Sequence, residues 1–270
     1  MSKLHNYQKF LFFYDNMLYN SSAQKEGKIM KVKIQPKERM NAEIAKLFVD
    51  TINAKPNCIL GLATGSSPLG VYNLLIEAYK NNEVSFKEVT TFNLDEYVGL
   101  DEENDQSYRY FMNHNLFDHI DINKENTHVP SGVGEFEKHT EEYDEMIEKA
   151  GGIDLQILGI GSDGHIAFNE PGTPFNSLTH VAELAQSTIE DNSRFFNSIE
   201  EVPTKAVTMG LASIMKAKKI VLIATGENKA DAIQGLLQGL VTEQLPCSVL
   251  RHHPDVTIYV DKAAYSKVKM

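Results

Sequence analysis

The sequence predicts an α/β fold: an open, mostly parallel, doubly wound (Rossmann-like) sheet with helices on both faces and a lid segment. Two observations lead to this class. Short, continuously apolar runs alternate with stretches of helical periodicity, and strands that are apolar throughout are typical of parallel sheets covered on both faces. Glycines and small polar residues follow several of these runs. Because such sheets bind ligands beyond the carboxyl ends of their strands, we expect the functional residues there.

The elements expected up to residue 94 alternate between strand and helix. A strand with alternating charged and apolar residues begins at Met30. The helix after it has one apolar face, made of Met40, Ile44, Leu47, Phe48 and Ile52. The expected strands are 30–34, 57–64 and 89–94, and the expected helices are 36–55 and 68–82. Each helix opens on a proline, which a first helical turn tolerates.

The second half of the chain continues the alternation. Further strands are expected at 153–161, 218–226 and 256–261, with helices at 135–150 and 228–240. Residues 184–205 are mostly polar, and we interpret them as the lid segment or a surface helix.

The domain organisation follows from the same pattern. Residues 1–29 lack clean periodicity, so we expect a dispensable N-terminal extension. Residues 30–270 then form a single domain, a length at which one large core is ordinary.

Composition excludes several classes of protein. The net charge is −11, and without a basic stripe this argues against nucleic acid as a partner. No apolar run approaches the roughly 18 residues of a membrane span. Cys58 and Cys247 each lie beside an apolar run, so we expect buried free thiols in a reducing compartment. These features predict a cytoplasmic protein.

The first polar turn, Thr64, Gly65, Ser66 and Ser67, lies between a strand and a helix. Backbone N–H groups at a helix start, together with hydroxyls, form an anion site. The turn lacks the Gly-Lys-Ser/Thr ending of a Walker A loop. The alternative is an ordinary turn in which Ser66 or Ser67 caps the helix.

Two adjacent carboxylates, Asp95 and Glu96, follow the strand at 89–94. Their side chains point in different directions, so at most one faces a pocket. A carboxylate at a strand end is a candidate general base, and a plain polar loop is the alternative.

The stretch "GIGSDGHIAFNEPGTPF", 159–175, contains Asp163, His165 and Glu170. It matches G-x-G-x-x-G, but a dinucleotide site requires a helix next, and the prolines after it prevent one. A histidine between carboxylates is held in one tautomer and can shuttle protons. Metal binding by the three side chains is an alternative, but no fourth ligand follows. We therefore predict a catalytic loop without a metal or cofactor.

Two cations complete the predicted site. Arg194 lies in the polar segment, and its planar guanidinium suits a phosphate. Lys229 lies at the start of a helix, where a cation opposes the helix dipole, so an anionic ligand explains it better than helix stability does. A pocket with a cationic end and an acid–base end fits a phosphorylated small molecule.

Four motifs in this order and spacing resemble the glucosamine-6-phosphate deaminase family: "TFNLDEYVGL", "GIGSDGHIAFNEPG", "NSRFF" and "GENKA". The resemblance covers essentially Met30 to the end. It implies conversion of D-glucosamine 6-phosphate and water to D-fructose 6-phosphate and ammonia without a cofactor. Asp95 would move the proton from C2 to C1. His165 would open the sugar ring with Asp163 and Glu170 as its relay, and Thr64–Ser67, Arg194 and Lys229 would bind the phosphate.

One departure from the family bears on regulation and assembly. Some members are hexamers that N-acetylglucosamine 6-phosphate activates through an Arg and a Lys, and His180 and Ala182 stand at those positions here. The chain therefore resembles the shorter, non-allosteric members, and a homo-oligomer stays possible. A related 6-phosphogluconolactonase is one rival interpretation, although that family continues from "DGH" to Ala-Ser-Leu-Phe. A sugar-phosphate sensor without catalysis is the other.

Overall fold

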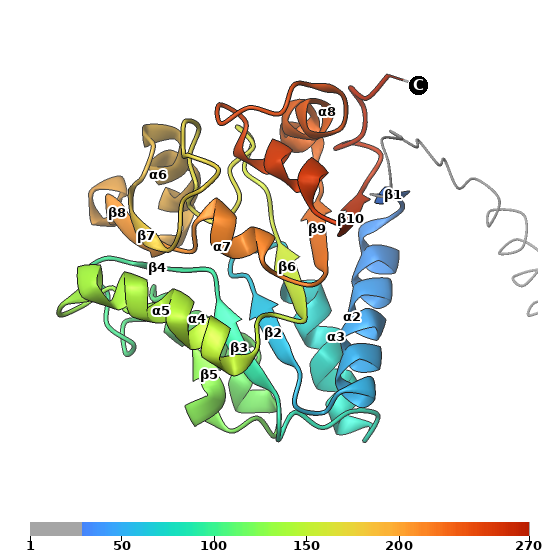
Figure 1. Cartoon of the computed structure of the whole chain (residues 1–270), viewed down its shortest axis with the longest axis vertical. Coiled ribbons are helices and arrows are strands. Elements are labelled where there is room, and N and C mark those ends of the chain that lie inside the picture. The colour runs from blue at the N-terminus through green and yellow to red at the C-terminus, as the bar shows by residue number, and fades with distance from the viewer. Residues whose placement is uncertain (1–28, 270) are drawn as a thin grey trace, which may run out of the picture.

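The computed structural model describes residues 29–269, and the predicted N-terminal extension lies outside them except for Ile29. Its main feature is a seven-stranded sheet in which all neighbouring strands are parallel (Figure 1). From one edge to the other the strands are β1 (Ile29–Ile34), β10 (Asp255–Val260), β9 (Ile220–Ala224), β6 (Leu155–Leu158), β2 (Ile59–Leu62), β3 (Thr90–Asn93) and β5 (Thr127–His128). The predicted fold class is confirmed.

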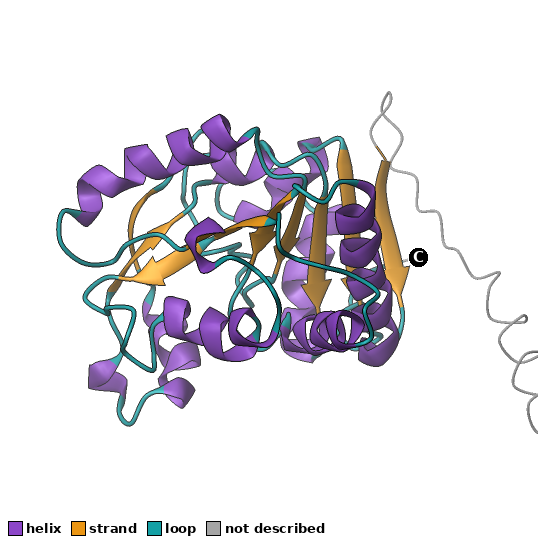
Figure 2. Cartoon of the chain, turned by 90° about the horizontal axis from the view of Figure 1, so that it is seen from below, coloured by secondary structure: helices purple, strands orange, loops and turns teal. Residues whose placement is uncertain are grey.

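Helices lie on both faces of this sheet (Figure 2). The helices of the described residues are α2 (Lys37–Ala54), α3 (Leu69–Lys80), α4 (Tyr108–Asn115), α5 (Phe136–Ala150), α7 (Leu211–Met215) and α8 (Ala230–Gln238), together with α6 (Gln186–Asn192), which lies beside the smaller sheet described below. The apolar face predicted for α2 is confirmed, because Met40, Ile44, Phe48 and Ile52 are buried and Leu47 packs against them. Each fully buried side chain of this size contributes about 1.5–3 kcal/mol to stability.

A second, three-stranded antiparallel sheet was not predicted. It consists of β4 (Asp95–Tyr97), β8 (Lys205–Thr208) and β7 (His180–Glu183). Its small core centres on Tyr97, Phe168 and Leu184. The alternative of a polar loop at residues 95–97 is therefore wrong, because these residues form a buried strand. The segment predicted as a lid contains α6 and short 3-10 turns beside this sheet.

The strand order positions the site. From β2 the chain runs outward through β3 and β5 to one edge, and from β6 it runs through β9 and β10 toward the other. The direction therefore reverses between β2 and β6, and ligands of doubly wound folds bind at such a point. The Thr64–Ser67 turn and the loop from Gly159 follow these two neighbouring strands.

Two other sequence predictions can be compared with the structure. Cys58 and Cys247 are buried free thiols, as predicted. Burial raises the pKa of each to about 12, so both stay protonated at neutral pH. Within the described range 29–269, no helix is both long and apolar enough to cross a bilayer.

Candidate active site

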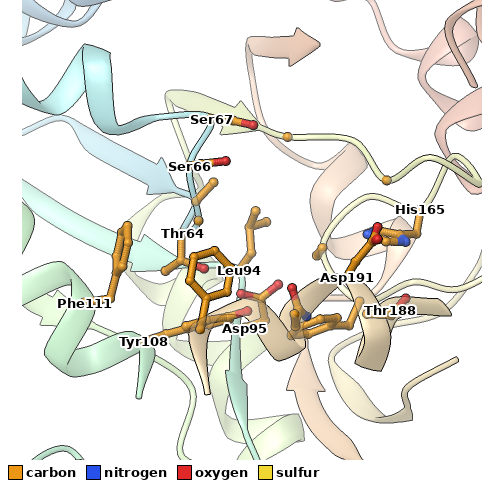
Figure 3. A pocket seen from close by; sticks show the side chains of 18 of the residues that line it. Thr64, Ser66, Ser67, Leu94, Asp95, Tyr108, Phe111, His165, Thr188 and Asp191 are labelled. Carbon is orange, nitrogen blue, oxygen red and sulfur yellow. The ribbon is translucent and has the colours of Figure 1, made fainter. Parts of the chain in front are cut away.

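A pocket of about 450 Å³ opens at the carboxyl ends of the parallel strands. Figure 3 shows Ser66 and Ser67 on one side of it, Asp95 and Tyr108 on another, and His165 across from them. Eight of the ten residues predicted from the sequence line it: Thr64, Gly65, Ser66, Ser67, Asp95, His165, Arg194 and Lys229. The other two, Asp163 and Glu170, contact His165.

The loop between β6 and Asn169 has a tightly determined backbone. Gly161 accepts the closest approach, because a Cβ there would lie 2.3 Å from the His165 ring. Gly164 has φ +88°, a left-handed conformation that glycine adopts without cost. The Asn169 side chain donates to the carbonyl groups of Ile166 and Met209 at 2.9 and 2.8 Å. Gly161 therefore makes room for the histidine, and a Cβ at Gly164 would instead lie 2.3 Å from Leu245.

His165 is held by two carboxylates at the same ring nitrogen. Asp163 Oδ1 lies 2.8 Å from His165 Nδ1, and Glu170 Oε2 lies 3.6 Å from it. Asp163 Oδ1 also accepts the His165 backbone N–H at 3.1 Å. Burial by itself would lower the pKa of His165, but the close contact with Asp163 and the negative charges of both carboxylates raise it to about 9. The same pairing holds the pKa of Asp163 below its usual range, although burial opposes this.

The three side chains also have the separations of a metal site. Their ligand atoms lie within 4.8 Å of one another, and catalytic zinc sites use three protein ligands. A cation at this place would require His165 without a proton at Nδ1. We interpret the three side chains as a proton relay, with metal binding as the alternative.

Asp95 begins β4 and is 6% exposed. Burial raises its pKa to about 8, and the neighbouring charge of Glu96 adds to this while His165 opposes it. A carboxyl group poised in this range is suited to proton transfer near neutral pH.

Glu96 points away from Asp95 and has a different task. It accepts the backbone N–H groups of Tyr97, Tyr108 and Arg109 at 2.8–2.9 Å. Two of these donors lie in the first turn of α4, where a carboxylate also complements the helix dipole. As predicted, only one of the two adjacent carboxylates lines the pocket.

The opposite end of the pocket is suited to an anion. Gly65 has φ +80°, and the turn before α3 presents Thr64, Ser66 and Ser67 to the pocket. The alternative in which a serine caps α3 is wrong, because Pro68 is the N-cap residue and no side chain caps the helix.

Both predicted cations line the same pocket. Arg194 lies in a 3-10 turn (Ser193–Phe195), and Lys229 ends another (Glu227–Lys229) directly before α8. Burial lowers the pKa of Lys229, while the charge of Asp191 opposes the change. An anion close to the half-buried ammonium of Lys229 would compensate for the hydration that this group loses on burial.

The pocket-lining residues that sequence reasoning missed include Tyr108, Thr188 and Asp191. Tyr108 forms an aromatic wall with Tyr97 and Phe168, at centroid distances of 4.8 and 6.1 Å. Of the three, only Tyr108 has a signal in the sequence. Ser107 is a typical N-cap residue and does cap α4, so a helix that begins at Tyr108 could have been predicted. Thr188 and Asp191 reach the pocket through the fold of the small sheet, which was not predicted.

Comparisons with known proteins agree with this arrangement. Residues 35–259 match the family described as glucosamine-6-phosphate isomerases/6-phosphogluconolactonase. A glucosamine-6-phosphate deaminase of Thermoanaerobacter pseudethanolicus is 57% identical over 232 residues, which cover 86% of this chain and 92% of that protein.

Solved structures give the same result. A monomeric glucosamine-6-phosphate deaminase of the NagB superfamily superposes with a TM-score of 0.86 at 43% identity, covering 88% of this chain and 99% of the other. A 6-phosphogluconolactonase from Trypanosoma brucei shares the fold, with a TM-score of 0.73 over 89% of this chain and 99% of the other, but only 19% identity. The family resemblance inferred from the motifs is thus confirmed: this chain belongs to the glucosamine-6-phosphate isomerase/6-phosphogluconolactonase family and, within it, to the glucosamine-6-phosphate deaminases.

Proposed function

We propose that this chain converts D-glucosamine 6-phosphate and water to D-fructose 6-phosphate and ammonia, without a cofactor. The observation that carries the proposal is the pairing of Asp95 with the Asp163–His165–Glu170 cluster around one pocket that Arg194 and Lys229 also line. The 57% identity to a glucosamine-6-phosphate deaminase supports the same substrate.

The reaction needs two separate proton transfers, and the pocket offers a group for each. His165 in its protonated form delivers a proton to the ring oxygen and takes the proton of the C1 hydroxyl, which breaks the C1–O5 bond and gives the open-chain aldehyde. Asp163 and Glu170 stabilise the imidazolium with which this exchange starts and ends. Asp95 then removes the proton at C2 while O1 takes up a proton from water, which gives an enolamine, and Asp95 delivers a proton to C1. Water adds to the resulting C2 iminium, ammonia leaves, and the proton taken up at O1 is balanced by one released to water.

The phosphate group anchors the substrate away from the reacting carbons. We assign it to the Thr64–Ser67 turn, Arg194 and Lys229, which line one end of the pocket. Binding energy gained at this end positions C1 and C2 between His165 and Asp95. Since Cys58 and Cys247 are free thiols, a cytoplasmic location is part of the proposal.

Ammonia release from glucosamine 6-phosphate tests the function directly. We expect turnover by the wild-type protein after treatment with a chelator, and no measurable hydrolysis of 6-phosphogluconolactone. Binding of the sugar phosphate without ammonia release would favour a sensor instead. Lactone hydrolysis faster than deamination would favour the lactonase interpretation.

We further propose that N-acetylglucosamine 6-phosphate does not activate this enzyme. His180 and Ala182 lie on β7 and offer no Arg–Lys pair for a second phosphate, and the superposed deaminase at 43% identity is monomeric. We expect a hyperbolic dependence of rate on substrate that this compound leaves unchanged. A sigmoidal curve that it sharpens would contradict the proposal, and analytical ultracentrifugation of the same sample gives the oligomeric state.

The pKa values predict a bell-shaped dependence of kcat/KM on pH. Asp95 acts as a base only when ionised, and its pKa of about 8 makes kcat/KM rise as the pH increases through this value. His165 must hold a proton to protonate the ring oxygen, and its pKa of about 9 makes kcat/KM fall above it. The maximum is therefore expected between these two values.

A matched variant tests the cause of the rising limb. Glu96→Gln removes the negative charge that adds to the pKa of Asp95, so this limb is expected at lower pH in the variant. If the rising limb of kcat/KM stays at the same pH in this variant, the limb belongs to a group other than Asp95.

A further inference from the structure

The two oxygens of the Glu170 carboxylate face different parts of the molecule. Oε2 lies 3.6 Å from His165 Nδ1. Oε1 accepts the Thr188 hydroxyl at 2.7 Å and the Ala185 backbone N–H at 3.3 Å. Both donors lie at the beginning of α6, 15 and 18 residues after Glu170 in the sequence. Their hydrogen bonds therefore connect this helix to the catalytic loop.

Thr188 makes the shorter of these two contacts. A hydroxyl that donates to a carboxylate at this distance forms a charge-assisted hydrogen bond, about twice as strong as a neutral one. Thr188 is 3% exposed and lines the pocket. In the described part of the chain, Glu170 Oε2 has no hydrogen bond of regular geometry, so the contacts of Oε1 determine where Oε2 lies.

We propose that Thr188 is a positioning residue of the ring-opening relay: its hydroxyl fixes the Glu170 carboxylate so that Oε2 stays beside His165 Nδ1. The inference rests on the proposed function, because it assigns the ring-opening proton transfer to His165. Thr188 touches Glu170 and acts on His165 only through it. Without the hydroxyl, Oε1 keeps the single long contact to Ala185, and the carboxylate can rotate away from the imidazole.

The charged groups around His165 give a second consequence. Asp163 and Glu170 face it from its own loop, Asp95 faces it from β4, and Asp191 and Lys229 line the pocket from α6 and the turn before α8. A Thr188 substitution leaves all of these charges in place and loosens only Glu170. His165 should therefore lose its proton at a lower pH, and the falling limb of the kcat profile should move down.

The experiment uses two pairs of variants that each differ by one hydroxyl: wild type against Thr188→Val, and Thr188→Ser against Thr188→Ala. Ammonia release is measured over a range of substrate concentrations and pH. Within each pair we expect loss of the hydroxyl to lower kcat about 10- to 100-fold, with KM changed less than about threefold. The falling limb should move to lower pH in both variants that lack the hydroxyl.

The controls separate the hydroxyl from packing. Arg194 follows α6 closely, so general disruption of the helix would displace a phosphate ligand and raise KM. Thr179→Val is the matched control, because Thr179 is buried and its Oγ1 has no hydrogen-bond partner among the described residues. This variant should keep the wild-type kcat. If Thr188→Val does not fold, the Ser and Ala variants decide.

The inference is overturned if wild type and Thr188→Val have equal kcat values. It is also overturned if Thr188→Ser loses as much kcat as Thr188→Ala does. A lower kcat with an unmoved pH limb also overturns it, because a structural role would suffice. If the wild-type protein releases no ammonia, the proposed function itself fails and the inference fails with it. A failure of the inference alone is recognised by normal wild-type turnover.

Discussion

Replacement of Asp95 by Asn is expected to abolish nearly all ammonia release. The amide has the shape of the carboxyl group but cannot take the proton from C2, and a positioned general base contributes about 10²- to 10⁴-fold to a rate. We expect kcat to fall by about this factor, with KM changed little, since the phosphate ligands are untouched. Asp95 is 6% exposed, so bulk water does not readily replace it as the base.

Solvent deuterium measures the affected step. Deuterium from the solvent should enter C1 of the fructose 6-phosphate that wild type produces, and the Asp95→Asn variant should show neither exchange nor product. Glu96→Gln is the matched control, because it changes the neighbouring carboxylate that binds backbone N–H groups. We expect it to lose less than about tenfold in kcat. A variant at Asp95 that keeps a tenth of wild-type turnover would contradict the assignment of the base.

The main sheet was predictable because its strands carry their own signal. Six of its seven strands were predicted: β1 alternates charged and apolar residues, and the other five are largely apolar. The seventh, β5, has only the two residues Thr127 and His128, too few for any periodicity. The site residues at the ends of β2, β3, β6 and β9 converge on one pocket for the same reason, because parallel strands end at one edge.

The small antiparallel sheet could not be predicted because its strands depend on tertiary contacts. Strand β4 reads Asp-Glu-Tyr, a polar triplet that is buried only because Glu96 accepts three backbone N–H groups and Tyr97 packs on Tyr108 and Phe168. The strand propensities of these three residues contain no information about such tertiary contacts. The positions of Thr188 and Asp191 follow from that sheet, and so both were missed.

The cap of α3 shows a different kind of error. Serine is a preferred N-cap residue, and Ser66 and Ser67 directly precede Pro68 in the sequence. The structure nevertheless leaves α3 without a side-chain cap and turns these residues to the pocket. An anion held by the same turn would take the place of a cap, and this is consistent with the phosphate site proposed for it.

Replacement of His165 by Gln is expected to separate ring opening from the later chemistry. Glutamine keeps a polar side chain but cannot exchange a proton between the C1 hydroxyl and the ring oxygen, so kcat for glucosamine 6-phosphate should fall about 10²- to 10⁴-fold. The proton transfer between C1 and C2 belongs to Asp95 and requires only an open-chain substrate. Fructose 6-phosphate contains some open-chain ketone in solution and supplies it without help from the enzyme.

The reverse direction therefore distinguishes the two catalytic groups. With fructose 6-phosphate and ammonium in deuterated water, the His165→Gln variant should still exchange hydrogen at C1, whereas Asp95→Asn should not. Thermal unfolding of both variants checks that the loop and β4 remain folded. Loss of exchange in both would mean that His165 also serves the C1–C2 transfer, and the Asp163–His165–Glu170 cluster would then act on the imine as well as on the ring. Retained exchange in His165→Gln alone would assign the relay to ring opening, because the forward reaction would then fail only at the step that produces the aldehyde.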